Sequence, residues 1–133
     1  MRERLPDRRE SHSVAATHVW APGTAQEIHE PLLVTYSCYA DGRIGEVFID
    51  SLAEARGKLA ARTTDMQKDV AVVISLALQH GATLDELREA AGNAEANLMG
   101  KIHQMPATIV GTVIEVLAAE QPQWLTKEGE TPC

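Results

Sequence analysis

The side chains most capable of chemistry are five histidines and two cysteines, and their spacing matches no known site. No two histidines stand four residues apart, as a helical zinc site requires; they are His12, His18, His29, His80 and His103. Cys38 follows Ser37 on a predicted strand, where a buried, inert cysteine is more usual than a nucleophile. The sequence contains neither a glycine-rich phosphate loop nor a G-x-S-x-G elbow. We therefore expect no metal, no cofactor and no catalytic residue, which favours a non-catalytic protein without deciding whether it is an enzyme.

Composition narrows the class of protein further. The 133 residues are 44% hydrophobic and 23% charged, as in an ordinary globular domain, and the formal net charge is -7. Such a charge disfavours non-specific binding to nucleic acid or to an anionic membrane. The chain has no hydrophobic N-terminal segment and no apolar run long enough to span a bilayer. We expect a cytoplasmic protein with one domain.

One stretch, Asp65 to Gly81, is predicted to organise the fold. Its apolar residues recur at helical spacing around most of the helix circumference, which predicts a central helix covered on two sides. Thr63 or Thr64 is expected to cap its start, and His80-Gly81 is a typical C-terminal signal.

The N-terminal half has the patterns of strands. Val14–Ala21, Leu32–Tyr39 and Arg43–Asp50 are the predicted strands, with a loop over Gly23–Pro31. Asp41-Gly42 predicts a tight hairpin turn. We expect an antiparallel meander of two or three strands.

The C-terminal half has the patterns of helices. Ser51–Arg62 is either a short helix or an ordered loop, and Thr83 with Glu86 forms a capping box for a helix that follows. Asn93–Gln104 is expected to be partly helical, and Pro106 to lie in the first turn of a last helix that ends before Pro122. The prediction is an α+β fold in which the meander is followed by a layer of three to four helices. Residues 1–13 form a flexible arm, 14–122 one domain and 123–133 a flexible tail.

Leu78–Ile102 has the rhythm of a helix-turn-helix motif, which leaves a transcriptional regulator as an alternative. The expected recognition helix offers Asn93, Glu95, Asn97 and Lys101. A single lysine opposed by a glutamate releases few counterions from DNA. We therefore expect that nucleic acid is not a partner.

The sequence resembles the TSCPD-type domain, which occurs at the C-terminal end of adenosylcobalamin-dependent (class II) ribonucleotide reductases and as small free-standing proteins. The residues that carry the resemblance are YADGRIGEVFID at 39–50, Lys58, Asp69 and ISLALQHGATLDELREA at 74–90. RLPDRR near the N-terminus resembles the arm of the free-standing members, and ATIVGTVIEVL at 107–117 resembles their final segment. Two family features differ: the Gly-Ser after the lysine and the C-terminal cysteine motif are absent.

The resemblance implies an accessory role. In the full-length reductases the catalytic cysteines and the cobalamin site belong to a large barrel that this sequence does not contain, so no catalytic residue carries over. The resemblance therefore implies a binding or regulatory module that acts through protein–protein contacts. The alternative from another class is an accessory component of a ribonucleotide reductase or of another nucleotide-metabolism enzyme.

The surfaces expected to meet a partner combine cations with apolar residues. The guanidinium groups of the N-terminal arm can bind carboxylate or phosphate groups. The helices also have more apolar surface than one small sheet can cover. We therefore expect a homodimer or another protein partner. The candidate partner-binding residues are Arg4, Arg8, Arg9, Lys58, Val116 and Trp124.

Overall fold

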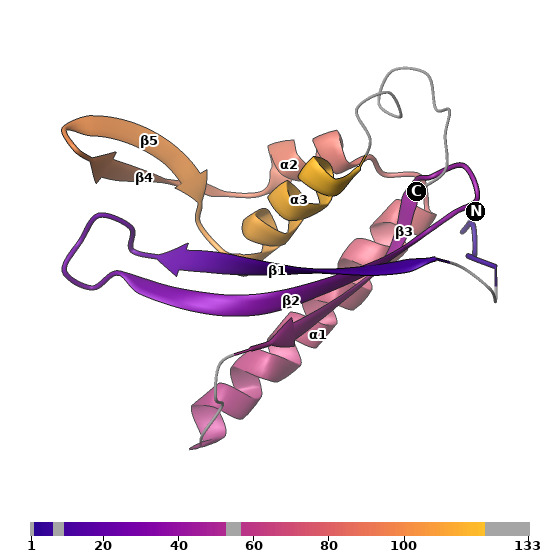
Figure 1. Ribbon diagram of the computed structural model, residues 1–133, viewed down its shortest axis with the longest axis horizontal. Coiled ribbons are helices and arrows are strands. Elements are labelled where there is room, and N and C mark those ends of the chain that lie inside the picture. Colours follow the sequence, from indigo (N-terminus) through magenta and orange to yellow (C-terminus); the bar gives the residue numbers. More distant parts are fainter. Residues whose placement is uncertain (1, 7–9, 53–56, 122–133) are drawn as a thin grey trace.

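The chain folds as a three-stranded sheet with helices, followed by a small second sheet (Figure 1). The computed structural model describes residues 2–6, 10–52 and 57–121, those from 57 to 64 by their backbone only. The first sheet consists of β1 (Ser11–Trp20), β2 (Ile28–Cys38) and β3 (Ile44–Ser51). The remaining elements are α1 (Gly57–Gln79), α2 (Leu84–Ala90), β4 (Asn93–Leu98), β5 (Lys101–Pro106) and α3 (Ile109–Glu120). The predicted α+β class and the antiparallel meander are confirmed.

The meander has the order β1-β2-β3, and each neighbouring pair is antiparallel. Asp41-Gly42 forms the predicted turn, with Gly42 at a φ of 93°. The predicted loop over Gly23–Pro31 is too long, because β2 already begins at Ile28 and runs through Pro31. The proline is tolerated because it lies just beyond the last β2–β3 pair, Leu32 with Ser51, where no N–H of Pro31 is needed. Its carbonyl still accepts a 3.0 Å hydrogen bond from the backbone nitrogen of Leu52.

The helix α1 covers the open edge of β3. Ser75 Oγ accepts a 2.8 Å hydrogen bond from the backbone nitrogen of Val47, and Gln79 Nε2 donates one of 2.8 Å to the carbonyl of Gly45. Both helix side chains are buried. An edge strand otherwise presents unpaired backbone groups to other chains, and here the helix satisfies two of them.

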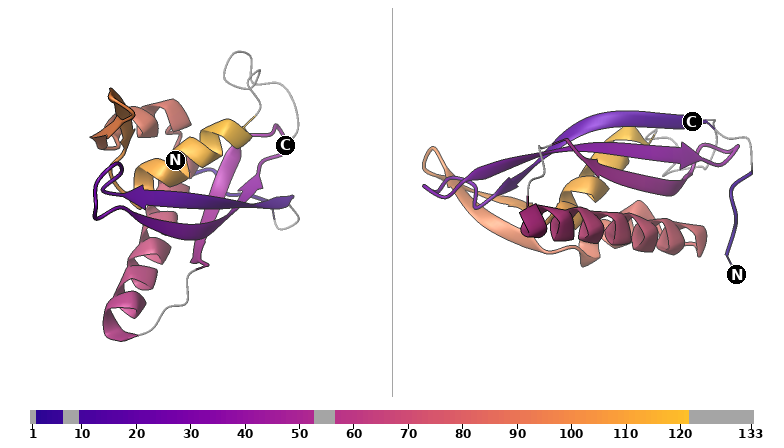
Figure 2. Two further views of the ribbon diagram at one scale, coloured as in Figure 1. Left: turned by 60° about the vertical axis from the view of Figure 1, so that its left-hand side comes forward. Right: turned by 90° about the horizontal axis from the view of Figure 1, so that it is seen from below.

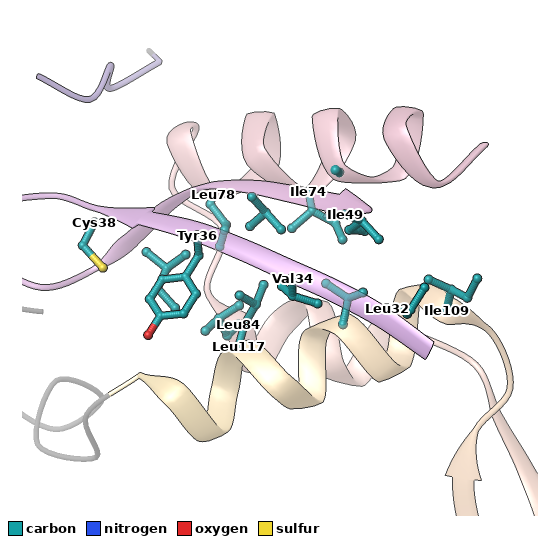
Figure 3. Packing of buried hydrophobic residues seen from close by; sticks show 14 residues of the cluster. Leu32, Val34, Tyr36, Cys38, Ile49, Ile74, Leu78, Leu84, Ile109 and Leu117 are labelled. Carbon is teal, nitrogen blue, oxygen red and sulfur yellow. The ribbon is translucent and has the colours of Figure 1, made fainter. Parts of the chain in front are cut away.

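The hydrophobic core lies between one face of the sheet and the helices α1 and α3 (Figure 2). Alternate residues of β2 point into it, as the two-residue period of a strand requires. Figure 3 shows these side chains between Ile74 and Leu78 of α1 and Ile109 and Leu117 of α3. The opposite face of the sheet is mixed: Ser13 is exposed and Thr35 half-buried there, while Leu33 is half-buried and Phe48 half-exposed.

The segment Asn93–Gln104 is not helical, and this part of the prediction is wrong. It forms the hairpin of β4 and β5, which turns at Met99 and Gly100 with φ values of 54° and 80°. The helix-turn-helix interpretation is wrong with it, since the expected recognition helix is a strand. The β1–β2 turn meets this hairpin at Gly23, where a Cβ would lie 2.7 Å from the carbonyl oxygen of Asn97.

Several element boundaries differ from the predicted ones. The helix α1 begins at Gly57, so Thr63 and Thr64 lie inside it and do not cap it. Pro106 ends β5, and the last helix begins after the N-cap Thr108. The capping box of Thr83 and Glu86 is present as predicted.

The first described residues contact the folded domain. The backbone nitrogen of Glu3 donates a 2.7 Å hydrogen bond to the carbonyl of Gln79, and the Glu3 carboxylate lies 3.1 Å from Arg43 Nη2. The strand β1 begins at Ser11, three residues before the predicted start at Val14. The domain limits at 13 and 122 stay a prediction.

Candidate partner-binding surface

The helix α1 leaves one long apolar face open, so the prediction of a helix covered on two sides is not met in the described residues. Ile74 is buried at 4% exposure, whereas the adjacent Val73 is 65% exposed. Met66 is 68% and Val72 56% exposed, and Leu76 is also partly open. An aliphatic side chain on a solvated helix face contributes little to the stability of the fold. A group of such side chains is typical of an interaction surface.

Part of this face forms a groove between α1 and the start of α3. The groove has a volume of about 360 Å³. Its lining residues are Met66, Asp69, Val70, Val73, Ile74 and Val110. Asp69 is the one charged side chain among them, and it makes no hydrogen bond or ion pair with the described residues. The groove therefore combines an apolar floor with one carboxylate that has no partner in the part of the chain that the structure describes.

A larger cavity, of about 620 Å³, lies at the other end of α1, and both guanidinium groups that line it are already paired. Arg88 donates two hydrogen bonds, of 2.9 and 2.8 Å, to the carboxylate of Glu115. Arg43 pairs with Asp41 at 2.7 Å and lies 4.7 Å from the ring centre of Tyr39. Paired guanidinium groups offer little to an anionic ligand, so this cavity is the weaker candidate.

A buried polar cluster joins the sheet to both helices. His18 Nδ1 lies 2.6 Å from Thr112 Oγ1, while Glu30 accepts hydrogen bonds from Trp20 Nε1 at 2.8 Å and from Gln67 Nε2 at 3.0 Å. Desolvation lowers the pKa of His18, and the nearby Glu30 carboxylate opposes that shift. With 1% of its surface exposed, His18 cannot reach a substrate, so the cluster is structural.

Of the six predicted partner-binding residues, the structure describes the side chains of two. Arg4 is exposed in the N-terminal segment, whereas Val116 is half-buried and packs against the core. Arg8, Arg9 and Trp124 lie outside the described residues, as does the side chain of Lys58. Their role in binding stays a prediction. The open face of α1 was visible in the sequence only as an excess of apolar residues around the helix.

The described residues show neither a metal cluster nor a membrane helix. No group of three or more histidine, cysteine, aspartate or glutamate side chains within these ranges could hold a metal ion. None of the helices in the described ranges combines the length and apolar content needed to cross a bilayer.

Comparison with known proteins gives one informative similarity. No family model and no solved structure matches the chain. An 89-residue stretch, 67% of the chain, is 39% identical to part of a vitamin B12-dependent ribonucleotide reductase of Agrobacterium fabrum (strain C58 / ATCC 33970). The match spans only 6% of the length of that reductase. The chain therefore contains a domain related to a small part of a ribonucleotide reductase.

Proposed function

We propose that the protein is a non-catalytic module of the TSCPD type that binds a protein partner through the groove between α1 and α3. The observation that carries this proposal is the exposure of Val73 and Met66, which line this groove next to the buried Ile74. On the opposite face of the sheet, apolar side chains such as Phe48 lie among polar ones such as Ser13. Protein–protein contacts in turn favour apolar patches such as the one in the groove.

We further propose that the partner belongs to a ribonucleotide reductase system. The 39% identity to a segment of the vitamin B12-dependent enzyme supports this assignment. The module would then regulate or assemble a reductase without contributing a catalytic residue.

Size-exclusion chromatography of the protein with the purified vitamin B12-dependent reductase of Agrobacterium fabrum tests the assignment. The proposal predicts co-elution, together with a change in the rate of ribonucleotide reduction when the module is added. It also predicts that the module alone, supplied with adenosylcobalamin and ribonucleotide, forms no deoxyribonucleotide. Separate elution at micromolar concentrations of both proteins, with an unchanged rate, would contradict the proposal.

A further inference from the structure

We propose that the groove between α1 and α3 binds an amphipathic helix of the partner, and that this helix carries a lysine or arginine opposite Asp69. The inference rests on the proposed function, because it specifies the partner that the same face of α1 receives. It adds the secondary structure and the charge of the segment that docks.

The shape of the groove suits a helix. Met66, Val70 and Val73 follow one another at intervals of four and three residues, so their side chains form one continuous stripe along α1. Val110 of α3 forms the opposite wall. An apolar trough between two helices is the surface on which an amphipathic helix places its residues i, i+3, i+4 and i+7.

The charge at the groove selects a basic helix. Asp69 is exposed at the rim and has no partner among the described residues. A helix packed over Val73 would remove water from this carboxylate, which is unfavourable unless the helix supplies a cation. The net charge of -7 also favours encounter with a basic segment.

A second copy of this chain fits the groove less well. Lys68 is the one cation among the described side chains of α1, which run from 65 to 79. At 3.6 residues per turn it lies roughly 160° around the helix from Met66, and so on the far side from the stripe. If two copies paired through this stripe, the described residues of the other copy's stripe would bring no cation to Asp69. A foreign basic helix supplies the cation that these residues lack.

Two synthetic peptides test the inference on the full chain. Both are alanine-based helices of about 18 residues, long enough to be partly helical in water, with the same leucine stripe. One carries lysine and the other glutamate beside the stripe. Fluorescence anisotropy is expected to show the lysine peptide binding at least about threefold more tightly at low salt, a preference that weakens as salt is added. Asp69→Asn should remove the preference, and Asp69→Lys should reverse it.

Two valines that are neighbours on α1 supply the matched control. Val73→Glu places a charge in the groove and should abolish binding of the lysine peptide. Val72→Glu changes an equally exposed valine that does not line the groove, and should leave binding nearly unchanged. Circular dichroism of both variants checks that the fold is intact.

Three results would overturn the inference. They are equal affinity for the two peptides, equal loss of binding in the two valine variants, and a dimer that Val73→Glu converts to a monomer while no peptide binds. If neither peptide binds but Val73→Glu still prevents co-elution with the reductase, the proposed function stands and the basic helix is excluded. If the lysine peptide binds as expected and the reductase does not, the groove inference stands and the reductase assignment fails.

Discussion

The hydroxyl of Ser75 on α1 lies 2.8 Å from the backbone nitrogen of Val47 on β3, and it also lies 2.8 Å from the carbonyl of Ala71 one helical turn earlier. One buried side chain thus accepts from the sheet edge and donates within its own helix. This contact fixes the rotation of α1 on the sheet. It thereby determines that Ile74 points into the core and Val73 away from it.

Removing this hydroxyl should destabilise the domain. In Ser75→Ala the backbone N–H of Val47 is left buried without an acceptor, which is expected to lower the free energy of unfolding by about 1–3 kcal/mol. Urea denaturation followed by circular dichroism measures the change. Ser13→Ala is the matched control, because Ser13 is exposed and bonds only to Thr35 on the open face of the sheet. Its effect should stay within about 0.5 kcal/mol. Equal effects of the two substitutions on the free energy of unfolding would contradict a stabilising role for the Ser75 hydrogen bond to Val47.

The buried His18 predicts a loss of stability in mild acid. Its pKa in the folded state is lowered from 6.5 by burial, so the unfolded chain binds a proton more readily. The contribution of His18 is therefore fully present above about pH 6.5, and it is lost as the pH falls below 6.5 toward the folded-state pKa. Urea midpoints between pH 7.5 and pH 5 measure this slope.

The variant His18→Gln should flatten the slope over this range. His103→Gln, at an exposed position of β5, serves as the control and should keep the wild-type slope. Parallel stability curves for wild type and His18→Gln would contradict the assignment of the acid sensitivity to His18.

The contact between the β1–β2 turn and β4 should be sensitive to a single methyl group. Gly23 has a φ of 76°, and its Cβ would meet the carbonyl oxygen of Asn97, whereas a Cβ on Gly100, at a φ of 80°, would meet nothing within 4 Å. Both alanine variants bear the strain of a left-handed residue, about 1–2 kcal/mol. Gly23→Ala should therefore lower the free energy of unfolding by more than Gly100→Ala does. Thermal and urea denaturation of the pair isolate the contact, and equal destabilisation would argue against it.

Local signals explain which parts of the fold were predictable. Asp41-Gly42 determines a turn by itself, and Thr83 with Glu86 caps a helix within four residues. The hairpin of β4 and β5 has no such signal. Its alanine, leucine and glutamate residues suit a helix, and Met99-Gly100 is not a typical hairpin pair. Its strands are established by pairing with each other, which single-residue propensity does not encode.

The candidate surface was less predictable than the fold, since exposure depends on tertiary contacts. Val73 and Ile74 are nearly identical in chemistry and adjacent in sequence, yet one is open and the other is in the core. Periodicity alone placed both on the buried side. The buried polar residues Ser75 and Gln79, whose partners lie on β3, select the face that is covered.

The affinity of the two valine variants for the reductase tests the central claim most directly. Wild type, Val72→Glu and Val73→Glu would each be labelled and titrated with the purified vitamin B12-dependent reductase in fluorescence anisotropy. If the groove on α1 is the docking site, Val73→Glu should weaken binding by about tenfold or more, as expected for a charge buried at the centre of an interface, while Val72→Glu should bind nearly as wild type. Saturable binding of wild type that Val73→Glu leaves unchanged would contradict the assignment of this surface.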